Sequence, residues 1–122
     1  MVCGVNIDGG LFGDYSRDVL EKPFLQLSCK DNENVVTRVY LRHTKPVYKV
    51  VFRDMRHMGF SDMKHAMKPG YTMGRLDPDA MHRNLSMCHL EFFDAYLKKS
   101  KPEPEIESND VITVSKYDPD LP

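Results

Sequence analysis

The chain has 122 residues, of which 41% are hydrophobic and 29% charged, and its formal net charge is −1. This composition predicts one folded domain and excludes a disordered chain. A nearly neutral chain gives no electrostatic reason to expect nucleic acid or an anionic membrane as a partner. No apolar run in the sequence is long enough to span a membrane.

The three cysteines, Cys3, Cys29 and Cys88, are predicted to be buried free thiols. No CxxC pair occurs, and an odd number does not suggest a disulfide framework. Free thiols fit a reducing compartment and favour the cytoplasm, although a secreted location stays open. The histidines are scattered without an HExxH pattern, and no glycine-rich phosphate loop occurs. The sequence therefore predicts neither a metal site nor a cofactor.

The predicted elements begin with a strand over residues 1–7, whose nearly continuous apolar run indicates burial on both faces. A glycine-rich loop follows. Residues 22–30 are a second predicted strand. A helix is predicted over residues 31–44, because Asp31 suits its N-terminus and the valines that follow form an apolar stripe.

Residues 45–54 are a third predicted strand, and residues 55–76 are a long irregular stretch of the kind that often carries function. The clearest helix covers residues 77–100, with Asp77 as its cap and Pro78 in its first turn. Apolar side chains at helical spacing predict its buried face: Met81, Leu85, Cys88 and Phe92.

Strands that alternate with helices predict an α/β fold with a mainly parallel sheet. Only three strands are convincing, and nothing in the sequence covers the outer edge of the first, so we expect the second half of a larger domain. Residues 1–100 would form this part of the domain, and residues 101–122 an acidic, proline-containing tail. Within the tail, residues 111–117 either add an edge strand or lie loosely on the surface.

Three polar residues follow the carboxyl ends of the predicted strands, where functional groups of open α/β sheets collect: Asp8, Asp31 and His57. An acid and a histidine in this arrangement can be two members of a nucleophile–His–acid triad. Each residue also has a plainer interpretation. Asp8 can cap a turn beside two glycines, Asp31 can cap a helix, and His57 can be an ordinary loop histidine.

Four segments of the chain stand out: GVNIDGGLFG, KPFLQLSCKD, VYKVVFRDMRHMGFSD and CHLEFFDAYLK. In this order they resemble the C-terminal half of α/β-hydrolases, and in particular the group related to platelet-activating-factor acetylhydrolase. The resemblance covers residues 2–99. It implies the C-terminal portion of an α/β-hydrolase fold with about three parallel strands. It further implies an ester or lipid-like substrate and catalytic roles for Asp8 and His57, with Asp31 as the alternative acid.

The sequence departs from that group because it contains no G-x-S-x-G and no oxyanion-hole loop. The resemblance therefore implies a serine esterase or lipase whose acid and histidine lie in this chain and whose nucleophile does not. The isolated chain is then expected to be inactive without its N-terminal half. Two alternatives stay open. One is a non-catalytic α/β protein that pairs with itself or a partner through an open sheet edge, and the other is a small α/β binding module.

Overall fold

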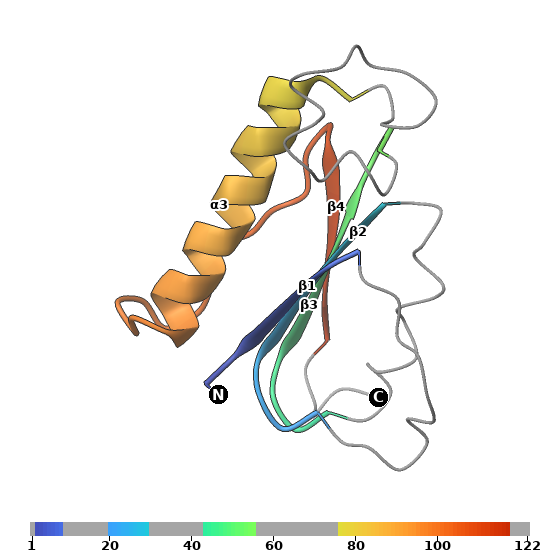
Figure 1. Cartoon of the computed structure of the whole chain (residues 1–122). Helices are drawn as coiled ribbons and strands as arrows, with labels where there is room; N and C mark the ends of the chain where they lie inside the picture. The colour runs from blue at the N-terminus through green and yellow to red at the C-terminus, as the bar shows by residue number, and fades with distance from the viewer. Residues whose placement is uncertain (1, 9–19, 30–42, 56–75, 118–122) are drawn as a thin grey trace.

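A sheet and one long helix form two layers in the computed structural model, which describes residues 2–8, 20–29, 43–55 and 76–117 (Figure 1). The strands are β1 (Gly4–Ile7), β2 (Phe24–Cys29), β3 (Val47–Phe52) and β4 (Ile112–Tyr117), and the helix is α3 (Pro78–Tyr96). The strand order is β1-β2-β3-β4. The first three strands are parallel and β4 is antiparallel to β3. The predicted α/β arrangement with a mainly parallel sheet is therefore confirmed.

Burial differs between the inner and the outer strands of this sheet. All six residues of β3 and five of the six residues of β2 are buried. The residues of β1 are half-buried or exposed, and Ile7 is 42% exposed. The prediction that the first strand is buried on both faces is wrong for β1, because this strand lies at the edge of the described sheet.

Strand β4 lies within the predicted tail. It pairs with β3 along its whole length, from Phe52 opposite Ile112 to Val47 opposite Tyr117. Residues 112–117 thus form an edge strand and do not lie loosely on the surface. Their pairing satisfies the backbone groups of β3 on the side away from β2.

Helix α3 begins as its sequence predicts. The Asp77 carboxylate caps it by accepting a hydrogen bond from the Ala80 backbone N–H at 3.0 Å, and Pro78 occupies the first turn. The helix ends at Tyr96, four residues before the predicted end. Lys99 lies beyond it with a φ of 57°, a left-handed conformation that cannot continue a right-handed helix.

The hydrophobic core lies between α3 and one face of the sheet. The predicted helix positions face it, with Met81, Cys88 and Phe92 buried and Leu85 packed against the cluster. The sheet contributes every second residue of its inner strands, as expected for one face. These residues are Leu25, Leu27 and Cys29 of β2 and Tyr48, Val50 and Phe52 of β3.

An aromatic contact joins the two layers. The rings of Tyr48 and Phe92 meet edge to face with their centroids 6.4 Å apart, a favoured geometry for aromatic pairs. The Tyr48 hydroxyl lies 3.3 Å from that of Tyr96, so one hydroxyl can donate to the other. Burial, and secondarily this contact with Tyr48, raises the pKa of Tyr96.

The opposite face of the sheet carries a row of polar side chains. Asn6, Gln26, Lys49 and Ser115 lie directly opposite one another on the four strands. The Asn6 side-chain amide donates to Gln26 Oε1 at 2.9 Å, and the Gln26 amide donates to the Leu27 carbonyl at 3.0 Å. Gln26 is fully buried, so these hydrogen bonds offset the cost of removing its amide from water.

The segment between α3 and β4 is tied to the helix by polar contacts. Glu91 Oε1 accepts hydrogen bonds from Lys101 Nζ at 2.6 Å and from the Glu105 backbone N–H at 2.8 Å. The Asn109 side-chain amide donates to Asn84 Oδ1 at 2.9 Å. These contacts hold the segment alongside α3 before the chain enters the sheet as β4.

The two faces of α3 give a direct test of the core. Phe92 is fully buried and Leu90 is 61% exposed. Phe92→Ala should lower the free energy of unfolding by about 3–5 kcal/mol, because it removes a buried ring and leaves a cavity. Leu90→Ala should change it by less than about 0.5 kcal/mol. Urea unfolding followed by circular dichroism measures both. Equal losses would show that α3 does not pack as described.

The contact at Glu91 predicts a pH dependence. The hydrogen bond from Lys101, followed by that from Glu105 N–H, lowers the pKa of Glu91 from its ordinary value of 4.5. The stabilisation is therefore fully present above pH 4.5 and is lost as the pH falls through the lower, folded-state pKa. Glu91→Gln should lower the melting temperature slightly at pH 7, and this difference should vanish in acid.

Thermal unfolding between pH 3 and pH 7 tests this prediction. Glu107→Gln is the matched control, because Glu107 is an exposed residue of the same segment. A Glu91→Gln difference that does not depend on pH would show that the charge of Glu91 is not responsible for it.

Candidate functional site

Asp8 lies at the carboxyl end of β1 and is 2% exposed. Its backbone N–H donates to the Leu27 carbonyl at 2.6 Å, which continues the pairing of β1 with β2 by one residue. Its φ is 53°, so the backbone turns into the left-handed region directly after the strand. Asp tolerates this conformation better than most residues do. The described backbone pairing of β1 with β2 therefore reaches no further than Asp8.

The Asp8 side chain takes over a hydrogen bond of the strand ladder. The Cys29 backbone N–H donates to Asp8 Oδ1 at 3.1 Å. In a regular parallel ladder this N–H would go to the backbone carbonyl of residue 8, because residue 8 already donates to residue 27. The carboxylate thus satisfies a buried donor at the point where the backbone turns away. This replacement explains why β1 ends on an acid.

The second oxygen of the same carboxylate is also held by Cys29. The Cys29 thiol lies 3.4 Å from Asp8 Oδ2 and donates to it. Both residues are almost fully buried, since Cys29 is 1% exposed. A carboxylate offers about four acceptor positions, and Cys29 uses two of them.

Of the predicted site residues, the described ranges include Asp8 but neither His57 nor Asp31. Because β1, β2 and β3 are parallel, their carboxyl ends share one edge of the sheet. In the sequence, Asp31 follows Cys29 by two residues and His57 follows Phe52 by five. The predicted proximity of the two residues to Asp8 stays a prediction.

The cysteines are free, as predicted, but differ in burial. Cys29 and Cys88 are buried, whereas Cys3 is only half-buried. Burial raises the pKa of the Cys88 thiol to about 12. The contact between Cys29 and Asp8 was not anticipated from the sequence. This contact follows from the register in which Ile7 pairs with Leu27, because that register brings residue 8 to the end of β2.

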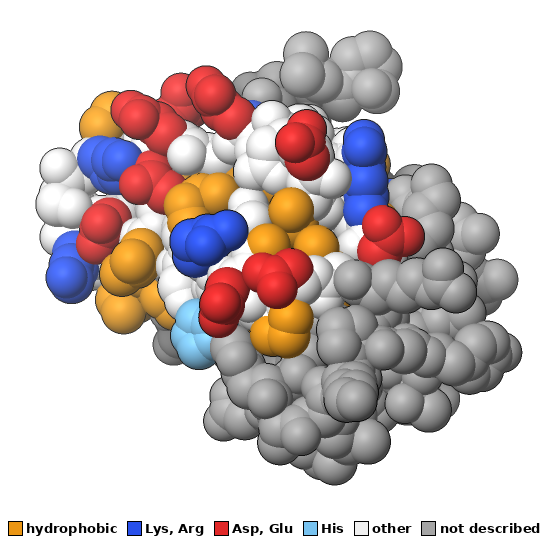
Figure 2. All heavy atoms as spheres, turned by 90° about the horizontal axis from the view of Figure 1, so that it is seen from above, with side chains coloured by type: hydrophobic (Ala, Val, Ile, Leu, Met, Phe, Trp, Pro, Cys, Tyr) orange, Lys and Arg blue, Asp and Glu red, His pale blue; other side chains and the backbone are white. Residues whose placement is uncertain are grey.

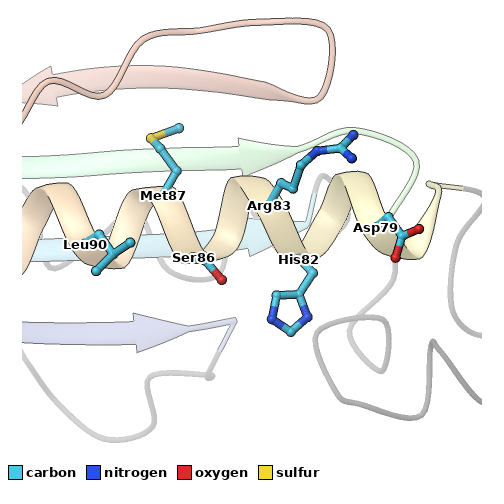
Figure 3. Close-up of a pocket in the computed structure, with 6 residues that line it drawn as sticks. All are labelled: Asp79, His82, Arg83, Ser86, Met87 and Leu90. Atoms are coloured by element: carbon cyan, nitrogen blue, oxygen red, sulfur yellow. The ribbon is translucent and has the colours of Figure 1, made fainter.

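A shallow hollow lies on the exposed side of α3 (Figure 3). The residues that line it are Asp79, His82, Arg83, Ser86, Met87 and Leu90. All of them belong to one helix, and Figure 3 shows His82 and Ser86 on one side of it and Arg83 and Met87 on the other. Neighbouring side chains of one exposed helix surface do not by themselves form a catalytic site.

The surface has mixed charge on the face shown in Figure 2, where acidic and basic side chains are interspersed around apolar ones. Within the described ranges, no group of three or more His, Cys, Asp or Glu side chains is placed to hold a metal ion. A search of the same residues found no helix with the length and apolar character needed to cross a membrane.

Comparison with protein-family models, with curated proteins and with solved structures found no significant match for this chain.

Two substitutions at position 8 test the structural role of the carboxylate. Asp8→Gly removes it without a penalty for positive φ, and leaves the buried Cys29 N–H without this acceptor. We expect a loss of about 1–3 kcal/mol in the free energy of unfolding. Asp8→Asn keeps an acceptor oxygen and should cost less. Chemical denaturation measures both, and an Asn variant as unstable as the Gly variant would contradict the described hydrogen bond.

Proposed function

We propose that this chain supplies the acid and the histidine of a serine ester hydrolase of the α/β-hydrolase type, with Asp8 as the acid and His57 as the general base. The observation that carries the proposal is the position of Asp8. It is a buried carboxylate at the carboxyl end of a parallel strand, with both oxygens oriented by hydrogen bonds. Such an acid suits the third position of a triad, where it must be held in place and shielded from water.

The chemistry assigned to these residues is proton transfer. The His57 imidazole takes the proton of a serine hydroxyl as that oxygen attacks the ester carbonyl, and returns it to the leaving alcohol. The Asp8 carboxylate accepts the other imidazole N–H and stabilises the imidazolium. Water then attacks the acyl-enzyme by the same route. The serine and the oxyanion donors belong to a part of the enzyme outside these 122 residues, because the sequence has no G-x-S-x-G.

Asp8 is proposed in preference to Asp31 because a triad acid must be held in place by hydrogen bonds while it is shielded from water. Removing a carboxylate from water is costly unless it accepts hydrogen bonds. Asp8 meets this condition through Cys29. Asp31 stays the alternative acid, and it lies outside the described residues. Substitution of each acid separately distinguishes the two.

The second candidate function is a non-catalytic protein that pairs through the edge of its sheet. The observation in its favour is that β1 is the outer strand of the described sheet. Its last residue, Ile7, is 42% exposed, and Val2 just before the strand is 52% exposed. Edge strands with exposed apolar side chains can pair with a second chain. In that case Asp8 would only terminate β1.

The test uses the native polypeptide that carries this sequence, isolated from its source with an antibody against residues 101–111. A fluorophosphonate probe should label it, and it should hydrolyse a p-nitrophenyl ester. In the recombinant form of the same polypeptide, His57→Ala and Asp8→Asn should each lower kcat by about 10³- to 10⁴-fold. Asp31→Asn should have little effect.

His82→Ala is the matched control, because His82 is an exposed histidine on α3. Activity should be unchanged in this variant. Full activity of His57→Ala would refute the proposal. A loss of activity in Asp31→Asn but not in Asp8→Asn would transfer the role of the acid to Asp31. A native polypeptide that self-associates, is not labelled and does not hydrolyse esters would favour the non-catalytic alternative.

A further inference from the structure

We propose that Cys29 is a positioning residue for the triad acid, because its thiol fixes the rotation of the Asp8 carboxylate. The catalytic part of this inference rests on the proposed function. The hydrogen bond between the two side chains can be measured without any activity.

The two contacts of Cys29 with Asp8 restrict different motions. The backbone N–H of Cys29 holds Oδ1 at 3.1 Å and would by itself leave the carboxylate free to rotate about that contact. The terminal torsion of an Asp side chain is broad, so such rotation costs little. The thiol holds Oδ2 at 3.4 Å. With both oxygens held by one residue of the neighbouring strand, the plane of the carboxylate is defined.

A thiol suits this role because it is a weak donor. The negative charge of the acceptor and the burial of both groups strengthen the hydrogen bond enough to orient the carboxylate. A weak donor also competes little with the imidazole N–H that the carboxylate must accept during catalysis. In this proposal Cys29 orients the Asp8 carboxylate through a donor that does not displace the imidazole N–H.

The core holds Cys29 itself in place. Cys29 is the last residue of β2 and belongs to the hydrophobic cluster formed by β2, β3 and α3. Cys29 is paired with Phe52 on β3, and the other buried members of the cluster include Met81 and Phe92. The orientation of the acid is thus coupled to the packed interior through Cys29.

Vibrational spectroscopy of the S–H stretch tests the hydrogen bond. Cys29→Ala and Cys88→Ala assign the bands of the two buried thiols. We expect the Cys29 band at lower frequency than the Cys88 band, because its acceptor is a carboxylate. Asp8→Asn should move the Cys29 band upward and leave the Cys88 band in place. A Cys29 band that coincides with that of Cys88 in the unsubstituted protein would overturn the proposal.

Kinetics of the ester-hydrolysing polypeptide test the consequence for catalysis. Cys29→Ala should lower kcat by about 10- to 100-fold with little change in KM, because a misplaced acid affects the reacting imidazole and not substrate binding. Cys29→Ser keeps a donor and should restore most of the rate. Cys88→Ala, which removes a buried thiol distant in sequence from the acid, should leave kcat unchanged.

The outcomes separate the two proposals. An unchanged kcat in Cys29→Ala, or equal losses in the Ala and Ser variants, would refute the positioning role while His57→Ala still tests the hydrolase. Full activity of His57→Ala would refute the hydrolase and with it the catalytic role of Cys29. The S–H band would then still decide whether the thiol binds Asp8.

Discussion

The packing of α3 against one face of the sheet is the interaction on which the other described elements depend. Buried side chains such as Phe92 and Phe52 belong to this contact, and each contributes roughly 1.5–3 kcal/mol by leaving water. Strand β1 contributes only Val5 to it, which is partly buried, as is Cys3 directly before the strand. Its position therefore depends strongly on its pairing with β2, and the link from Asp8 to Cys29 attaches its end to the core.

Asp8 combines two features that are individually unfavourable, a buried carboxylate and a backbone in the left-handed region. Stability alone would be served by an exposed glycine at such a turn. The two hydrogen bonds from Cys29 offset the cost of removing the carboxylate from water. The left-handed backbone conformation at Asp8 directs the carboxylate toward Cys29. A strained and buried acid at the carboxyl end of a parallel strand is the kind of exception that accompanies functional sites.

The sequence predicts those parts of the fold that depend on local patterns. The apolar runs of β2 and β3 and the cap at Asp77 are such patterns, and the structure confirms them. The predicted end of α3 is too late, because the polar residues Lys98, Lys99 and Ser100 fit a helix end as well as a turn. The contact of Cys29 with Asp8 cannot be predicted from a local pattern, because it depends on the register between two strands about twenty residues apart. The proposed acid and histidine come from a resemblance and from their positions after strand ends, and of these residues only Asp8 lies within the described part.

The row of polar side chains on the second face of the sheet helps to determine the register in which the strands pair. If β2 slipped by one residue against its neighbours, Gln26 would turn toward α3 and Leu25 and Leu27 would turn away. The amide would then enter an apolar layer, and the leucines would meet Lys49 and Asn6. A shifted register would therefore be less stable because of unfavourable contacts on both faces of the sheet. The same row thus helps to fix the register that brings Asp8 to the end of β2, where the N–H and the thiol of Cys29 contact its carboxylate.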